Sequence, residues 1–121
     1  MKYVRLYWIR QSWYIKPLVG PAYWNRCIKI PLFMNYKRGG LHVEKEVLVP
    51  VKYKGVVVGD PLRIDILVEG KVIIECKATE KDNPIFAVQT LTYLRLLKLH
   101  LGLLINFGKE TLIAGYKRVV N

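Results

Sequence analysis

The sequence predicts one small α/β domain, in which a mixed β-sheet is accompanied by one main helix. Between residues 44 and 78, β-branched apolar segments alternate with Gly and Pro, which is typical of short strands. One capped segment with helical periodicity follows between residues 82 and 102, and further apolar segments come after it. The resulting order is β-β-β-β-α-β-β. With 121 residues, 52% of them hydrophobic, the chain is long enough for a single core.

The predicted strands before the helix are Glu44 to Tyr53, the short apolar segment Gly55 to Gly59, Leu62 to Val68, and Lys71 to Ala78. Pro50 cannot donate a backbone hydrogen bond, so it indicates a sheet edge or a bulge within the first strand. The last two strands are joined around Glu69-Gly70, a pair typical of a hairpin turn.

The predicted helix begins after Asp82 or Asn83, either of which can cap it, and Pro84 fits its first turn. We expect Gly102 to end it. Its apolar stripe consists of Ile85, Val88, Leu91, Tyr93, Leu96 and Leu99. After the helix, we predict a buried strand over Leu103 to Phe107, and a last strand or a short helix over Leu112 to Val120.

The net charge of +11 indicates a polyanionic partner, and its distribution divides the chain. Residues 1–39 form an atypical basic and aromatic N-terminal segment without an acidic residue, whereas residues 40–121 form the predicted core. No apolar segment reaches the roughly 20 residues of a membrane span, and the N-terminus does not resemble a signal peptide. Cys27 and Cys76 lie far apart without metal-ligand spacing, which indicates a reduced, cytoplasmic protein.

Asp65, Glu75 and Lys77 interrupt otherwise apolar strand sequence. Alternation places Glu75 and Lys77 on one face and Cys76 on the other, and it places Asp65 opposite Ile64 and Ile66. A two-residue turn at Glu69-Gly70 would pair Asp65 with Ile74. A turn that includes Lys71, or one bulge, would pair Asp65 with Glu75 directly, and only that register brings the two carboxylates together.

Converging carboxylates repel one another, and a hard divalent cation such as Mg²⁺ relieves that repulsion. The Cys76 carbonyl offers a further oxygen ligand, and Lys77 would orient a water molecule or stabilise developing charge. This is the chemistry of phosphodiester hydrolysis. The alternative is that Asp65, Glu75 and Lys77 form only the solvated face of a half-buried sheet.

Residues 40–121 resemble the GxxExxY family of the PD-(D/E)XK nuclease superfamily in "LHVEKEVLVPVKYKGVVVGD", "RIDILVEGKVIIECKATE", "AVQTLTYLRLLKL" and "GLLINFG…YKRVVN". The resemblance implies a restriction-endonuclease-like core with Asp65 as the metal-binding Asp and Glu75 and Lys77 as the E-x-K pair. It also implies Mg²⁺ or Mn²⁺ as cofactor and nucleic acid, DNA or RNA, as partner. Gln89 and Tyr93, four apart on one helix face, resemble a supporting Q-x-x-x-Y, and ordinary helix-surface packing is the alternative.

The resemblance stops before residue 40, where the family has G-x-x-E-x-x-Y, often "GLLESVY…YEL". Codons for Leu-Leu-Glu-Ser-Val, read one base later, give Tyr23–Cys27, and codons for Tyr-Glu-Leu give Met34–Tyr36. The hypothesis is that roughly residues 20–36 translate another reading frame. The alternative is a divergent basic arm that grips nucleic acid through Lys, Arg and stacked Trp.

We therefore predict a metal-dependent nuclease-like protein, with weak activity because the family Glu is missing. The alternatives are a non-catalytic nucleic-acid-binding module and a decayed gene product. Loss of the usual first helix would expose apolar sheet surface, so we also expect a homodimer through that surface.

Overall fold

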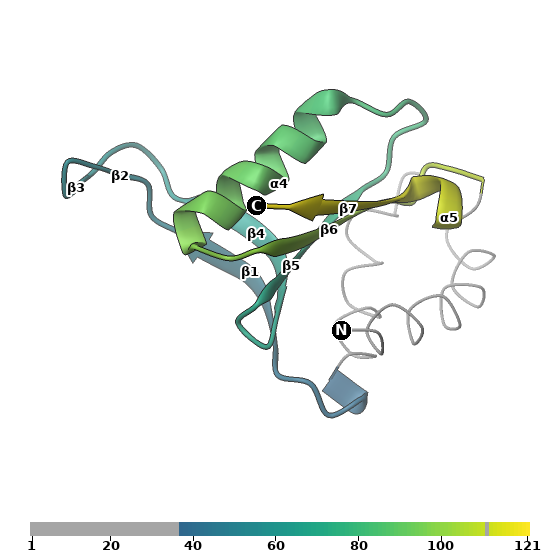
Figure 1. The fold of residues 1–121 in the computed structure, drawn as a ribbon, viewed down its shortest axis with the longest axis horizontal. Coiled ribbons are helices and arrows are strands. Elements are labelled where there is room, and N and C mark those ends of the chain that lie inside the picture. The colour runs from purple at the N-terminus through teal and green to yellow at the C-terminus, as the bar shows by residue number, and fades with distance from the viewer. Residues whose placement is uncertain (1–36, 111) are drawn as a thin grey trace.

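The computed structural model describes residues 37–110 and 112–121, which form a twisted sheet with helix α4 across one face (Figure 1). The five-stranded sheet of these residues has the order β1-β4-β5-β6-β7. The strands are β1 (Val43–Val49), β4 (Leu62–Val68), β5 (Val72–Lys77), β6 (Leu101–Asn106) and β7 (Tyr116–Val120). Only β5 and β6 pair in parallel, so the sheet is mixed. The predicted α/β class, with one main helix after the E-x-K strand, is confirmed.

The central strand β5 is buried on both faces, because its alternating side chains enter two different hydrophobic clusters. Val72, Ile74 and Cys76 belong to one cluster. Ile73 belongs to the other, together with Leu94 of α4. This explains why β4 and β5 are nearly continuous apolar runs, in which a carboxylate is conspicuous.

Helix α4 (Pro84–Leu97) begins as predicted but ends earlier. The side chain of Asn83 accepts a hydrogen bond from the Ile85 N–H at 3.0 Å, so Asn83 rather than Asp82 is the cap. Lys98, which adopts a left-handed backbone with φ 55°, ends the helix. The prediction that Gly102 ends it is wrong, since Gly102 lies in β6. A Cβ at Gly102 would lie 2.6 Å from Thr90 Cγ2, so this glycine allows α4 to approach the sheet closely.

The predicted apolar stripe is correct for half of its residues. Tyr93 is buried, and Leu91 and Leu99 pack against the same core cluster. Ile85, Val88 and Leu96 are exposed, whereas Thr90 and Leu94, which the stripe did not include, are buried. A Cβ at Gly102 of β6 would meet Thr90, so α4 approaches β6 closely at a pair of small residues.

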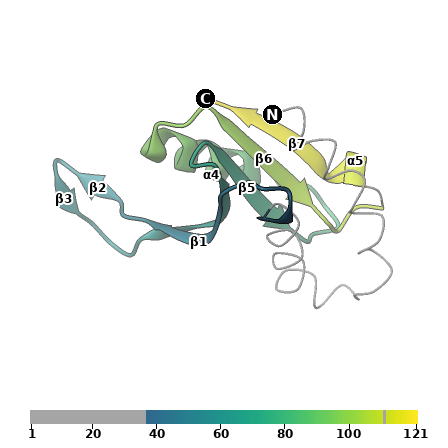
Figure 2. The ribbon, with the colours of Figure 1, turned by 90° about the horizontal axis from the view of Figure 1, so that it is seen from below.

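The predicted strand over Glu44 to Tyr53 is divided at Pro50 into β1 and a separate β2 (Lys52–Tyr53). The apolar segment after it contains β3 (Val56–Val57), which pairs with β2 and not with the main sheet. This two-stranded ribbon stands away from the rest of the domain (Figure 2).

The C-terminal segment contains both of the alternatives that the sequence left open. A short helix, α5 (Leu112–Gly115), leads directly into strand β7. No helix among residues 37–110 and 112–121 is long and apolar enough to cross a membrane. The predictions made for residues 1–36, including the out-of-frame segment, lie outside the described residues.

Candidate functional site

The register of β4 and β5 brings Asp65 and Glu75 to opposite positions. Val68 pairs with Val72 and Ile66 with Ile74, so the connection contains three residues and includes Lys71. Glu69 and Gly70 both adopt left-handed backbones, and the Lys71 N–H donates to the Val68 carbonyl at 3.0 Å. The structure thus has the one register, of the two considered, in which Asp65 faces Glu75.

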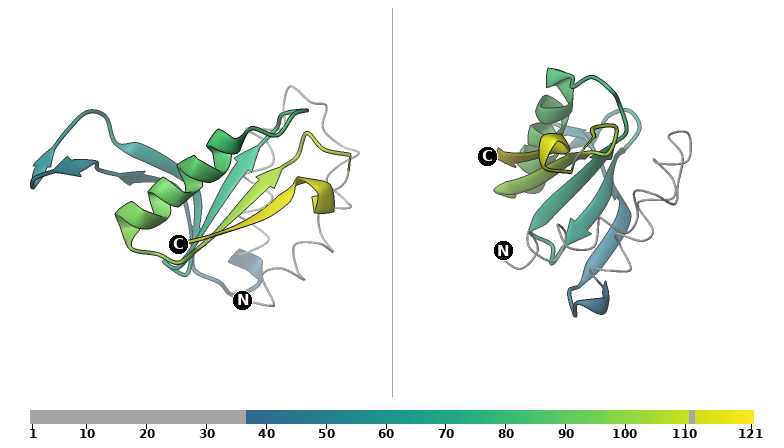
Figure 3. Two further views of the ribbon diagram at one scale, coloured as in Figure 1. Left: turned by 45° about the horizontal axis from the view of Figure 1, so that its top comes forward. Right: turned by 90° about the vertical axis from the view of Figure 1, so that its right-hand side faces the viewer.

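The backbone pairing of β4 and β5 stops at Ile66 and Ile74, and hydrogen bonds from backbone N–H groups to side chains link the two strands beyond that point. The Asp65 N–H donates to Glu75 Oε1 at 3.2 Å, and the Cys76 N–H donates to Asp65 Oδ2 at 2.9 Å. Asp65 is 8% exposed and Glu75 is 3% exposed. In Figure 3, left panel, β4 comes from the ribbon of β2 and β3 at the left, while β5 and β6 end at the right. Asp65 and Glu75 lie directly beyond the last paired residues, Ile66 and Ile74, and we call this place the fork of the sheet.

The other neighbour of Asp65 is a strained residue. The pairing of β1 with β4 is interrupted between Lys45–Ile66 and Val47–Ile64, which leaves Glu46 opposite Asp65. Glu46 has φ 53°, an uncommon conformation for a residue with a Cβ. Ile64 and Ile66 consequently enter different clusters on opposite faces, so the prediction that they share a face is wrong. The kink at Asp65 directs its carboxylate toward β5.

Cys76 contributes its side chain and its backbone in different directions. Its thiol side is buried in the cluster with Ile74, as predicted. The backbone carbonyl of the next residue, Lys77, accepts a hydrogen bond from the Phe107 N–H at 2.7 Å, so the backbone groups of Lys77 point toward β6. The Cys76 N–H instead points toward β4, and the N–H and C=O of one strand residue point the same way. The Cys76 carbonyl therefore faces the fork that holds Asp65.

Helix α4 holds Lys77 in place through a short chain of hydrogen bonds. Lys77 Nζ donates to Gln89 Oε1 at 2.8 Å, and Gln89 Nε2 donates to Tyr93 Oη at 2.8 Å. The Lys77 ammonium also lies 4.8 Å from the centre of the Phe86 ring. Gln89 and Tyr93 are thus not merely packed on the helix surface, because both belong to the network that orients Lys77.

The environment of Tyr93 shows how close this network lies to the carboxylates. Burial raises the pKa of the Tyr93 hydroxyl above its ordinary value of 10.0, and the negative charge of Glu75 raises it further. The hydrogen bond from Gln89 acts in the opposite sense, and Asp65 adds a further increase. Tyr93 therefore keeps its proton at physiological pH and presents a neutral hydroxyl near both acids.

One family model, described as the PD-(D/E)XK nuclease superfamily, matches residues 9–119 of the chain. The chain belongs to the PD-(D/E)XK nuclease superfamily. The match begins before residue 40 and so extends further than the resemblance noted in the sequence. No curated protein and no solved structure matches the chain.

Members of the PD-(D/E)XK nuclease superfamily generally use divalent metal ions, and the donors at the fork suit such an ion. Among the described residues, no three His, Cys, Asp or Glu side chains gather as a metal cage. The fork offers two carboxylates, from Asp65 and Glu75, and the Cys76 carbonyl. Mg²⁺ prefers oxygen, and it is usually held by one or two carboxylates together with water and phosphate. The residues present therefore fit the metal that the superfamily implies.

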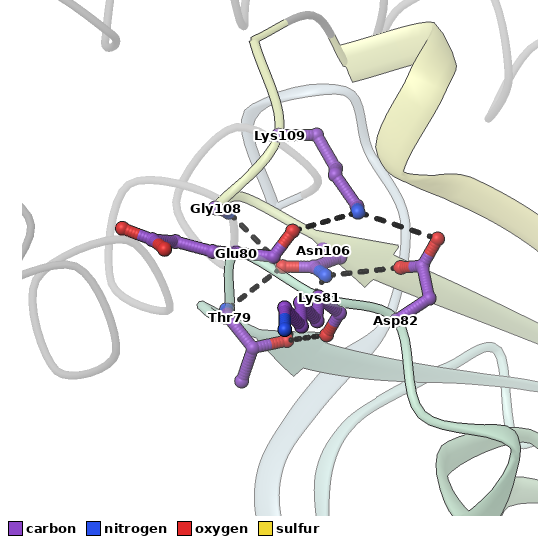
Figure 4. Close-up of polar contacts among 7 residues, drawn as sticks. All are labelled: Thr79, Glu80, Lys81, Asp82, Asn106, Gly108 and Lys109. Carbon is purple, nitrogen blue, oxygen red and sulfur yellow. Dashed lines mark hydrogen bonds and ion pairs between the residues drawn. The ribbon is translucent and has the colours of Figure 1, made fainter.

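Sequence patterns did not reveal one polar residue near the candidate site. Asn106, at the end of β6, is buried and forms four hydrogen bonds (Figure 4). Its Oδ1 accepts from the N–H groups of Thr79 and Gly108, both at 3.0 Å. Its Nδ2 donates to Thr79 Oγ1 at 3.1 Å and to Asp82 Oδ1 at 3.2 Å. An Asn inside the apolar stretch "LLINF" is the signal that could have revealed it, because buried amides need partners.

The contacts of Asn106 tie the loop after Lys77 to the end of β6. Lys109 strengthens the tie, since its Nζ donates to the Glu80 carbonyl at 2.8 Å and lies 3.5 Å from Asp82 Oδ2. Gly108 has no room for a Cβ, which would meet the Thr79 backbone. The segment that leads from Lys77 to α4, and hence to Gln89, is therefore held by the neighbouring parallel strand.

Proposed function

We propose that this chain is a metal-dependent nuclease that hydrolyses phosphodiester bonds of DNA or RNA. The juxtaposition of Asp65 and Glu75 carries the proposal, because it places two buried carboxylates at one point of the sheet and hard divalent cations take oxygen ligands of this kind. Asp65, Glu75 and the Cys76 carbonyl would hold Mg²⁺ or Mn²⁺. Such an ion lowers the pKa of a bound water and neutralises charge on the scissile phosphate.

The remaining residues of the proposal act through Lys77. Its ammonium group would orient the attacking water or stabilise the negative charge that develops on the phosphate. Gln89 accepts one hydrogen bond from Lys77 and so fixes the direction of the ammonium group, while Tyr93 in turn accepts from Gln89. Gln89 and Tyr93 are therefore proposed as positioning residues, and Lys77 as the catalytic residue.

A second candidate is a nucleic-acid-binding module without catalysis. It is favoured by residues 20–36, where the GxxExxY family has its Glu and this chain has no acidic residue. We also propose that the chain belongs to the GxxExxY family and that residues 20–36 translate another reading frame. Replacing residues 20–36 with the other-frame sequence "LLESVYKNTAVYEL" and its flanks should raise cleavage. Unchanged activity would remove the missing Glu as the cause of weak activity.

The test of the nuclease proposal is a cleavage assay on single- and double-stranded DNA and RNA, with Mg²⁺, Mn²⁺ or a chelator. Cleavage should need the metal and should be lost in Asp65→Asn, Glu75→Gln and Lys77→Ala. Asp60→Asn and Lys71→Ala are matched controls, because both residues are exposed and should leave cleavage intact. Metal-independent binding without cleavage of any substrate would favour the binding module.

A reduced, cytoplasmic setting and a homodimer complete the proposal. The reducing setting is proposed because the two cysteines, Cys27 and Cys76, lie far apart in the sequence. Light scattering of the purified chain measures its mass directly, and a monomer across the accessible concentration range would exclude the homodimer.

A further inference from the structure

The ribbon of β2 and β3 carries exposed side chains of two kinds. Tyr53 is 65% exposed and Val56 is 64% exposed, and Val57 and Val58 are also exposed. Lys52 and Lys54 are exposed on the same ribbon, and no acidic residue lies between Val47 and Gly59. The Lys54 ammonium lies 5.5 Å from the centre of the Tyr53 ring. An aromatic ring and one cation therefore lie together, and a second exposed lysine belongs to the same strand as the ring.

The backbone of the ribbon is well defined for so small an element. Tyr53 pairs with Val56 around the two-residue turn Lys54-Gly55, in which both residues are left-handed, with φ 48° and 81°. Such turns match the natural twist of a hairpin. The Val58 N–H donates to the Val51 carbonyl at 2.9 Å and extends the pairing toward the sheet. The ribbon thus presents its side chains on a fixed support.

The ribbon also has a fixed connection to the candidate site. It begins after β1 and continues through Pro61 into β4, on which Asp65 is the fourth residue. At about 3.3 Å per extended residue, the turn at Gly55 lies at most about 33 Å along the chain from Asp65. That length is roughly one turn of duplex nucleic acid. A duplex substrate at the fork would therefore reach the ribbon within about one helical turn.

We propose that the ribbon Lys52–Val58 is a nucleic-acid contact that grips the substrate outside the cleavage site. Lys52 and Lys54 would contact backbone phosphates, and Tyr53 would stack on a base or a sugar. Charge complementarity favours nucleic acid over a second copy of this chain, because two copies of a ribbon with lysines and no acids repel each other. This inference rests on the proposed nuclease function and names where the substrate is held.

The test measures binding by fluorescence anisotropy with labelled DNA and RNA in chelator, so that no cleavage intervenes. Lys52→Glu/Lys54→Glu should weaken binding at least about tenfold. The slope of log affinity against log salt concentration should fall by the amount expected for the loss of about two phosphate contacts. Lys71→Glu/Lys117→Glu is the matched control, since it makes the same change of charge at exposed positions away from the ribbon. Equal weakening by both variants would overturn the proposal, because it would reflect net charge alone.

Substrate length gives a second readout that a folding defect would not mimic. The ribbon variant should bind long substrates more weakly than wild type, and both should bind equally when the substrate is too short to reach from Asp65 to the ribbon. Tyr53→Ala should weaken binding of a long single strand by about fivefold or more. A length-independent defect, or none, would overturn the proposal.

The outcomes separate this inference from the nuclease proposal. Binding through the ribbon without metal-dependent cleavage would defeat the nuclease and leave the ribbon contact in place. Cleavage that is unaffected in the ribbon variants on long substrates would defeat the ribbon contact alone. If Val56→Asp/Val58→Asp instead converts a dimer to a monomer and leaves nucleic-acid binding unchanged, the ribbon is an interface between copies, and the proposal fails.

Discussion

The backbone N–H of Asp65 donates a hydrogen bond to Glu75 Oε1 at 3.2 Å, at the point where β4 and β5 separate. In an uninterrupted sheet that N–H would meet a backbone carbonyl. Here a carboxylate takes its place, and the Asp65 carboxylate accepts the Cys76 N–H in the same way. Where the backbone pairing of β4 and β5 stops, one N–H group of each strand therefore donates to a carboxylate of the other strand, and these two bonds hold Asp65 and Glu75 close together.

The two adjacent acids predict a metal-dependent change in stability. Mg²⁺ should raise the melting temperature of the wild type, because a ligand that binds only the folded state stabilises it, by about 2.7 kcal/mol at about one hundred times its Kd. Glu75→Gln keeps the shape of the side chain but removes a charge, so it should abolish most of this rise.

Thermal melts with MgCl₂, and with NaCl at matched ionic strength, measure this difference. Glu80→Gln is a control, since Glu80 is exposed and uses its backbone carbonyl rather than its side chain to bind Lys109. The same rise in Glu75→Gln and in the wild type would show that the metal does not bind at the fork.

Gln89→Leu separates positioning from metal binding. The change removes the acceptor for Lys77 and the donor to Tyr93, so the ammonium group loses its fixed direction. Cleavage should fall about tenfold to a hundredfold, the range expected for a misplaced catalytic group. The Mg²⁺-dependent rise in melting temperature should persist, because Gln89 is not a proposed ligand. Thr92→Ala is the control on the same helix, where the hydroxyl bonds only to the Val88 carbonyl.

Tyr93 predicts a dependence of stability on pH. Its pKa is raised in the folded state above the ordinary value of 10.0, so the folded chain holds this proton more tightly than the unfolded chain. The resulting stability is fully present below pH 10.0 and is lost as the pH rises through the folded-state pKa. The stability advantage of the wild type over Tyr93→Phe should therefore shrink in alkaline solution.

Urea unfolding of both proteins, from neutral to alkaline pH, tests the Tyr93 prediction. The two proteins share every other tyrosine, so the difference between them isolates Tyr93. An advantage that grows as the pH rises would contradict the raised pKa.

The sequence predicted the elements that local patterns determine. Leu62–Val68 was predicted with the bounds of β4, and Asn83 with Pro84 marked the start of α4. The sequence alone leaves two alternatives for the register, because Glu69-Gly70 allows turns of different length. The choice became visible only in the pairing of Val68 with Val72.

Other features depend on tertiary contacts and carried weak local signals. The end of α4 at Lys98 requires a left-handed lysine, a conformation that residue type alone does not favour. Glu46, opposite Asp65, is strained for the same reason. Spacing and family resemblance suggest Gln89 and Tyr93 as site residues, whereas the hydrogen bond between Lys77 and Gln89 depends on how α4 lies on the sheet.

Asn106 predicts a large loss of stability on truncation. Asn106→Ala removes four part-buried hydrogen bonds, two of them from the N–H groups of Thr79 and Gly108. A typical hydrogen bond contributes about 0.5–1.5 kcal/mol, so the free energy of unfolding should fall by about 2 kcal/mol or more. Urea unfolding measures it, with Asn121→Ala as the control, because Asn121 is an exposed C-terminal residue. A loss no larger than in the control would show that the loops do not depend on Asn106.

The close contact of Gly102 with Thr90 predicts a destabilising substitution that a second substitution relieves. In Gly102→Ala the new Cβ would lie 2.6 Å from Thr90 Cγ2, so α4 must shift away from β6. Overpacking of this kind costs about 1–3 kcal/mol. Thr90→Ser removes the clashing methyl group but keeps the hydroxyl, which donates to the Phe86 carbonyl at 3.0 Å.

The double variant Gly102→Ala/Thr90→Ser should therefore regain most of the stability that Gly102→Ala loses. A double-mutant cycle by urea unfolding gives the interaction free energy of the two changes, which should be favourable by about 1 kcal/mol or more. Gly40→Ala with Thr90→Ser is the control cycle and should be additive, because a Cβ at Gly40 has no neighbour within 4 Å. Additive losses in the Gly102 cycle would mean that Thr90 is not what restricts residue 102. The helix that carries Gln89 and Tyr93 would then be positioned by other contacts.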